Sequence, residues 1–119
     1  MGKAVILFGH GSRDPLWRRP MDAVAQRAAQ LRPDVAVLCA FLELEQPDLA
    51  AAAADLAGKG ASEITVVPLF LGAGRHARQD LPVLLEAARK AHPAVRFALQ
   101  PAVGEDSRVL DLLARIALE

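Results

Sequence analysis

Four apolar segments alternate along the chain with four segments of helical periodicity. The apolar segments are Lys3–Phe8 (KAVILF), Val35–Leu42 (VAVLCAFL), Glu63–Leu71 (EITVVPLFL) and the weaker Val95–Gln100 (VRFALQ). The nearly continuous apolar character of the first three predicts strands that are covered on both faces of a sheet. Pro68 has no amide donor, so we expect the third strand to bulge or end there.

The first helical segment begins near Met21 (MDAVAQRAAQL) and places Val24, Ala28 and Leu31 on one face. Two start signals, Asp14-Pro15 and Pro20, leave open whether this segment is one helix or two pieces. The other helices are expected from Pro47 to the glycines at 58 and 60, from Asp80 as N-cap to His92, and from about Glu105 with Val109, Leu112, Leu113 and Ile116 as its apolar residues.

Alternating strands and helices predict an α/β fold: a four-stranded parallel sheet with right-handed crossovers and helices on both faces. No linker or low-complexity tract interrupts the pattern, so residues 1–119 are expected to form a single domain. For a flavodoxin-like strand order of 2-1-3-4, ligands bind at the carboxyl ends of the strands, between strands 1 and 3.

Composition and charge narrow the class of protein. Hydrophobic residues make up 53% of the 119 residues and the formal net charge is zero, a globular balance that does not suggest a nucleic-acid or membrane-surface binder. The lone cysteine, Cys39, lies in an apolar segment and predicts a buried, reduced thiol and a cytoplasmic location. The N-terminal apolar run is too short for a secretory signal, and no run approaches the length of a membrane span.

Polar residues with metal-binding and proton-accepting chemistry follow three predicted strands. His10 lies in a Gly-rich loop after the first, Glu43 follows the second, and His76 follows the third. A lone loop histidine is most often structural, but two of them at the loops flanking the switch point favour a functional site. Imidazole and carboxylate groups bind borderline divalent metals and accept protons near neutral pH. Glu45 is an alternative to Glu43 as the acidic ligand.

Three arginines, Arg13, Arg75 and Arg78, lie in the same loops and could hold carboxylates or phosphates of a ligand. Surface arginines are common, so this interpretation depends on the histidines beside them.

The stretches FGHGSRDP, FLELEQPDL and VVPLFLGAGRHARQDLP closely resemble the motifs of the CbiX-type sirohydrochlorin chelatases, which are class II chelatases of sirohaem and cobalamin synthesis. The similarity covers about residues 3 to 86 with order and spacing kept. The resemblance implies that His10 and His76 are metal ligands and proton acceptors and that Glu43 is the acidic ligand. It also implies a substrate-binding set, consisting of Gly11, Ser12, Arg13, Gly74, Arg75 and Arg78.

The resemblance implies an enzyme that inserts a divalent ion (cobalt or iron, with nickel a further possibility) into sirohydrochlorin. The metal is then a substrate, and no permanently bound cofactor is expected. No Walker loop is present, in keeping with insertion that needs no ATP. The GAGRH segment differs from the more common LxxGxH form, which leaves the contacts of Arg75 open. The physiological metal is also open, because ligand affinity does not report the metal available in a cell.

Two other functions share these features. A metal or tetrapyrrole carrier would use the same site without catalysis. A histidine-phosphatase-like enzyme also has a histidine after its first strand, but Gly9 stands where that class has an arginine.

A single lobe offers one wall for a large flat macrocycle, and ligand sites normally bury most of their ligand. Longer relatives contain two such lobes, whereas this chain shows no internal repeat. We therefore expect a homodimer with two-fold symmetry, in which the two sites face a shared cavity.

Overall fold

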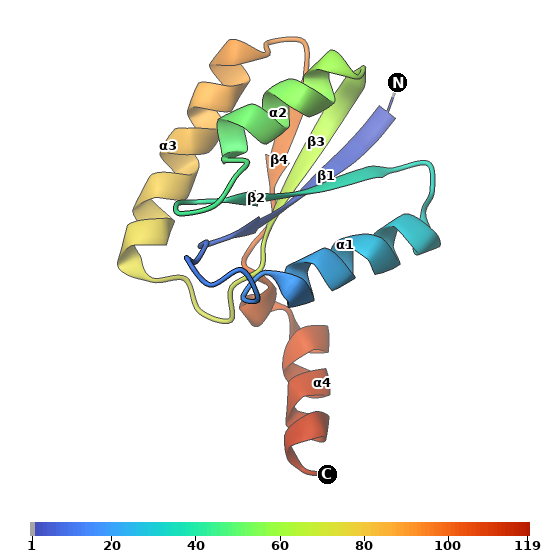
Figure 1. Ribbon diagram of the computed structural model, residues 1–119, viewed down its shortest axis with the longest axis vertical. Helices are drawn as coiled ribbons and strands as arrows, with labels where there is room; N and C mark the ends of the chain where they lie inside the picture. The colour runs from blue at the N-terminus through green and yellow to red at the C-terminus, as the bar shows by residue number, and fades with distance from the viewer. Residues whose placement is uncertain (1) are drawn as a thin grey trace.

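Four parallel strands form one sheet in the order β2-β1-β3-β4 in the computed structural model, which describes residues 2–119 (Figure 1). The strands are β1 (Gly2–Gly9), β2 (Ala36–Phe41), β3 (Ala61–Pro68) and β4 (Arg96–Leu99). The predicted order 2-1-3-4 is confirmed. β3 ends at Pro68, the residue at which the sequence predicts an interruption of the ladder.

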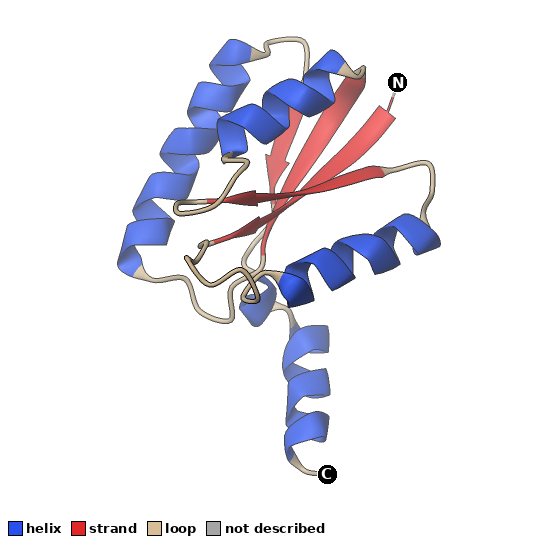
Figure 2. Ribbon diagram, viewed as in Figure 1, coloured by secondary structure: helices blue, strands red, loops and turns tan. Residues whose placement is uncertain are grey.

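Helices lie on both faces of the sheet. α2 (Leu49–Gly58) and α3 (Arg75–Ala91) pack on one face, and α1 (Arg19–Leu31) packs on β2 and β1 from the other (Figure 2). The crossovers β1-α1-β2 and β2-α2-β3 run in opposite directions across the sheet, so right-handed connections place α1 and α2 on opposite faces. None of the helices described is long and apolar enough to span a bilayer.

The larger core lies between the sheet and the pair α2 and α3. It is built from buried strand residues such as Ile6 and Ile64 and from helix residues such as Leu56 and Leu85. The smaller core, under α1, contains Met21 and Cys39. Burial raises the pKa of the Cys39 thiol to about 11, so the predicted buried thiol is confirmed and is protonated at neutral pH.

The structure decides between the two start signals of α1 in favour of Pro20, and it moves the start of α3. α1 is one helix from Arg19 with Pro20 in its first turn, whereas Asp14 accepts a hydrogen bond from the amide of Leu16 in a separate turn. α3 begins at Arg75, so the expectation of Asp80 as its N-cap is wrong. The extra turn forms because its inward residue, Ala77, is buried in the larger core.

The last helix, α4 (Ser107–Ala117), does not cover the sheet with the others and projects away from it (Figure 1). The chain before it forms a short 3-10 turn, η1 (Val103–Glu105), in which the amide of Gly104 donates to the carbonyl of Phe70 at 2.9 Å. A Cβ atom on Gly104 would lie 1.7 Å from the carbonyl oxygen of Leu71, so the close packing of η1 on the loop after β3 requires glycine. This contact directs α4 away from the sheet.

Truncation of Leu85 tests the position of the larger core. Leu85→Ala should lower the free energy of unfolding by about 3 kcal/mol, because it removes a fully buried side chain and leaves a cavity. Val83→Ala on the same helix is the control, since Val83 is 68% exposed, and its effect should stay within about 0.5 kcal/mol. Chemical denaturation followed by circular dichroism measures both, and equal losses would contradict the assignment of the core.

Candidate functional site

The central strand β1 brings the loops after β1, β2 and β3 to one edge of the sheet. Backbone hydrogen bonds continue beyond the β1–β2 ladder, since the amides of Leu42 and Glu43 donate to the carbonyls of Gly9 and His10 at 2.9 and 3.0 Å. On the other side of β1, the amide of Leu69 donates to the carbonyl of Phe8 at 2.8 Å. The predicted gathering of three strand-end loops is therefore present.

His10 is exposed at this edge, and its ring lies against the ring of Phe70 with the centroids 4.7 Å apart. The next residue, Gly11, has a φ of 96°, a conformation that favours glycine. A Cβ atom there would lie 1.8 Å from the carbonyl oxygen of Glu43. Gly11 thus allows the loop that carries His10 to pack directly on the loop that carries Glu43.

The two glutamates after β2 occupy different environments. Glu43 is exposed at the sheet edge. Leu44 has a left-handed φ of 68°, and the side chain of Glu45 beyond it is only 12% exposed. Glu45 Oε1 accepts a hydrogen bond from the amide of Ser12 at 3.2 Å, and its Oε2 lies 3.5 Å from Arg18 Nη1. Glu45 therefore supports the loop after β1, whereas Glu43 is available to a ligand.

Arg18 links this support to α1. Its Nε donates to Asp22 Oδ2 at 3.0 Å, and its guanidinium carbon lies 4.6 Å from the centroid of the Phe41 ring. The hydrogen bond to Asp22 raises the pKa of Arg18, with the carboxylate of Glu45 adding to the effect. The spacing of four residues between Arg18 and Asp22 is a sequence signal for their ion pair, whereas the contacts of Arg18 with Glu45 and Phe41 join distant parts of the chain.

His76 lies in the first turn of α3, and its side chain is 73% exposed. Its Nε2 is 3.0 Å from Asp80 Oδ2, one helical turn further along. Asp80, expected as an N-cap, is instead the partner of His76. The spacing of four residues between them was the signal in the sequence that could have identified this pair.

The three predicted metal ligands are not gathered into one preformed cluster. Across residues 2–119, no group of three or more His, Cys, Asp or Glu side chains lies close enough together to hold an ion. His10, Glu43 and His76 share an edge of the sheet but come from three separate loops. Their assignment as ligands stays a prediction.

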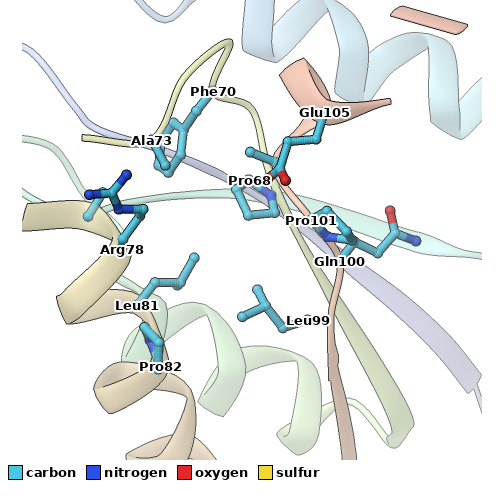
Figure 3. A pocket seen from close by; sticks show the side chains of 12 residues that line it. Pro68, Phe70, Ala73, Arg78, Leu81, Pro82, Leu99, Gln100, Pro101 and Glu105 are labelled. Atoms are coloured by element: carbon cyan, nitrogen blue, oxygen red, sulfur yellow. The ribbon is translucent and has the colours of Figure 1, made fainter. Parts of the chain in front are cut away.

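A cavity of about 200 Å³ is lined in part by Phe70, the residue whose ring also contacts His10 (Figure 3). Its lining is mainly apolar, with Arg78 of α3 and Glu105 of η1 as the charged residues. Arg78 is the one residue of the predicted substrate-binding set that lines this cavity. The others lie in the loops at the same edge, with Gly11, Ser12 and Arg13 after β1 and with Gly74 and Arg75 at the start of α3.

Three comparisons relate the chain to known proteins. The family model described as CbiX matches residues 4–119. A curated sirohydrochlorin cobaltochelatase from Methanosarcina acetivorans is 36% identical over 72% of this chain. The matched part covers 66% of that relative, and 63% and 57% of cobaltochelatases from Methanococcoides burtonii and Methanopyrus kandleri, so the chain spans less than two thirds of their lengths.

Two solved structures share the fold. A CbiX protein from Marinobacter aquaeolei VT8 superimposes with a TM-score of 0.83 at 33% identity, covering 98% of this chain and 93% of that one. The sirohydrochlorin chelatase SirB from Bacillus subtilis subspecies spizizenii, solved in complex with cobalt, gives a TM-score of 0.76 at 28% identity. The superimposed part covers 97% of this chain but 49% of the SirB chain.

Replacing the two glutamates tests their different roles. Glu45→Ala should lower the free energy of unfolding by about 1–3 kcal/mol, because it leaves the amide of Ser12 without its partner and removes one of the two carboxylates that face Arg18. Glu43→Ala is the matched control and should change the free energy of unfolding by less than about 0.5 kcal/mol, since the side chain of Glu43 is exposed. Thermal and urea unfolding measure both, and a larger loss in Glu43→Ala would contradict this assignment.

Proposed function

The chain belongs to the CbiX family, and from this premise we propose that it inserts a divalent metal ion into sirohydrochlorin without ATP. The observation that carries the proposal is the placement of two imidazoles and a carboxylate, His10, His76 and Glu43, at one edge of a sheet whose fold matches CbiX and SirB structures. The names of the relatives support sirohydrochlorin as the tetrapyrrole. The SirB structures with cobalt and with Fe³⁺ support a metal ion as the second substrate.

Metal insertion requires two chemical events at the same place. The macrocycle loses two pyrrole N–H protons, and the ion passes from protein ligands to the ring nitrogens. Imidazole serves both, because it binds borderline metals and accepts protons near neutral pH. His10 would meet the macrocycle from the loop after β1, and His76 from the start of α3.

Asp80 sets the orientation of His76. With Nε2 against the carboxylate, Nδ1 is the ring nitrogen that would meet a metal ion or a pyrrole proton.

Separate rather than clustered ligands suit an ion that is a substrate. A closed shell of four ligands would hold the metal as a structural ion, whereas a few exposed nitrogen and oxygen atoms bind it loosely and release it. Cobalt, iron and nickel all accept such ligands, and we infer no preference among them from the site. The same site could serve a carrier, which would bind the tetrapyrrole without accelerating insertion.

The peripheral acetate and propionate groups of the tetrapyrrole would meet Arg13, Arg75 and Arg78. The cavity beside Arg78, about 200 Å³, is smaller than the usual site for a drug-sized ligand and would accept one peripheral group rather than the ring. The ring itself would then lie against the exposed edge. We therefore retain the homodimer as part of the proposal, because a second copy would supply the opposite wall. A cytoplasmic location likewise stays a prediction.

Single substitutions of the histidines test catalysis. His10→Ala and His76→Ala should each lower the rate of Co²⁺ insertion into sirohydrochlorin at least about 100-fold, because each removes a metal ligand and proton acceptor. Glu43→Gln should lower the insertion rate by a smaller factor, and Glu45→Gln should lower it least. Anaerobic absorbance of the tetrapyrrole measures the rates, with circular dichroism to confirm folding.

His92→Ala is the control for these variants, because His92 caps the C-terminus of α3, at the opposite end of the helix from His76. Near-normal rates in both His10→Ala and His76→Ala would refute the assignment. Tight binding of sirohydrochlorin with no acceleration by the unmodified protein would identify a carrier.

Substitution of Arg78 separates binding of the two substrates. Arg78→Ala should weaken binding of sirohydrochlorin about 10-fold and leave binding of free Co²⁺ unchanged, because Arg78 lines the cavity and is not among the metal ligands. Titrations followed by absorbance and by calorimetry give the two affinities. Equal weakening of both would place Arg78 in support of the metal ligands instead.

A further inference from the structure

The imidazole of His10 is held differently from that of His76. His76 has the carboxylate of Asp80 at 3.0 Å from Nε2, whereas no hydrogen bond or ion pair within residues 2–119 engages the imidazole of His10. The ring of His10 instead contacts the ring of Phe70, with the centroids 4.7 Å apart and the planes tilted by 36°. A histidine that ligates a metal usually gains its orientation from a hydrogen bond at its second ring nitrogen. His10 has only the ring contact with Phe70 in place of such a bond.

Phe70 is itself fixed in place by side-chain and backbone contacts. Its side chain is 5% exposed and belongs to the larger core. Its ring packs against that of Phe8 in β1 with the centroids 6.2 Å apart and the planes at 70°, the edge-to-face arrangement that aromatic pairs favour. Its carbonyl accepts the hydrogen bond from the amide of Gly104 at 2.9 Å. The ring of Phe70 therefore offers His10 a fixed surface.

The contact also joins the two loops that carry the histidines. Phe70 lies in the segment between β3 and α3, which leads to His76. Phe8 and His10 are two residues apart, a spacing that places side chains of an extended chain on the same face of a sheet. The ring of Phe70 contacts both of them. Phe70 thus fixes His10 relative to the segment from which His76 comes.

The same ring lines the cavity of about 200 Å³ that Arg78 also lines (Figure 3). Under the proposed function, this cavity receives one peripheral group of the tetrapyrrole. A substrate group in the cavity would then contact the residue that holds His10. One side chain would in this way help to place both the macrocycle and the group that reacts with it, and small errors in such placement slow a reaction strongly.

We propose that Phe70 is a positioning residue for metal insertion, whose ring fixes the imidazole of His10 toward the substrates. This inference rests on the proposed function, in which His10 binds the ion and accepts a proton. A contact between two rings occupies neither imidazole nitrogen, whereas the contact of His76 with Asp80 occupies one. His10 is therefore oriented while both of its nitrogens stay available to the two substrates.

Proton NMR of the imidazole C–H groups tests the contact without an activity assay. The chain has three histidines, so His10→Ala, His76→Ala and His92→Ala assign their resonances. The ring current of Phe70 should displace the His10 resonances from those of an exposed histidine, and Phe70→Leu should abolish this displacement. Phe97→Leu is the matched control and should leave His10 unchanged, because Phe97 is 6% exposed in the same core and its ring neighbour is His92. Undisplaced His10 resonances in the unmodified protein would refute the proposal, whether or not Phe70→Leu folds.

The kinetics of Co²⁺ insertion test whether the contact matters for the reaction. Phe70→Leu should lower kcat about 10-fold and leave both KM values within about 2-fold, because leucine keeps the cavity lining apolar but offers no flat ring. Phe70→Tyr keeps the ring and should retain most of the rate, and Phe97→Leu should retain it as well. In a His10→Ala background, Phe70→Leu should lower the rate no further, since a positioning residue acts through the group that it holds.

The results separate this inference from the proposed function. A near-normal insertion rate in His10→Ala would refute the role of His10, and with it both proposals. A slow His10→Ala variant in which Phe70→Leu causes the same further loss as in the unmodified chain would leave the proposed function intact and overturn the positioning role. A raised KM for sirohydrochlorin with unchanged kcat in Phe70→Leu would also overturn it, because Phe70 would then act only as a wall of the cavity.

Discussion

The backbone pairing of the central strand β1 is the constraint on which the candidate site depends. β1 is hydrogen-bonded to β2 on one side and to β3 on the other, and the pairing continues through the first residues after each strand. Because the strands are parallel, their carboxyl ends meet at one edge, and the residues that follow cannot separate. A slip in the register of either neighbour would move Glu43 or His76 relative to His10 and also turn apolar side chains away from the core.

Around this frame, the supporting groups are separate from the groups that we propose to react. Glu45, Arg18 and Asp22 form a half-buried network that holds the loop after β1 against α1. Removing charges from water offsets much of the attraction between them, so the network contributes more to loop position than to global stability. His10, Glu43 and His76 remain exposed on the loops thus positioned. A site that receives and releases an ion needs this combination of a rigid support and open ligands.

The strands and their order could be predicted because continuous apolar segments and alternating helices leave few topologies. The start of α3 could not be predicted from the sequence, because Asp80 followed by Pro82 resembles the start of a helix. The helix begins earlier because Ala77 is buried in the assembled core. The different exposure of Glu43 and Glu45 depends on the left-handed conformation of Leu44, and no feature of the sequence predicts that conformation for a leucine. The direction of α4 depended on the packing of Gly104 on a loop distant in sequence.

The start of α4 lies at the same edge of the sheet as the candidate site. Leu110, Leu112, Leu113 and Ile116 of α4 are 40–55% exposed in a single chain. η1 is hydrogen-bonded to the loop after β3, so α4 starts at the same edge as His10. A partner held by α4 would therefore be tethered at that edge, where a macrocycle otherwise meets water on one face. Under the proposed dimer, a second copy near this edge would supply a wall for the face of the macrocycle that otherwise meets water.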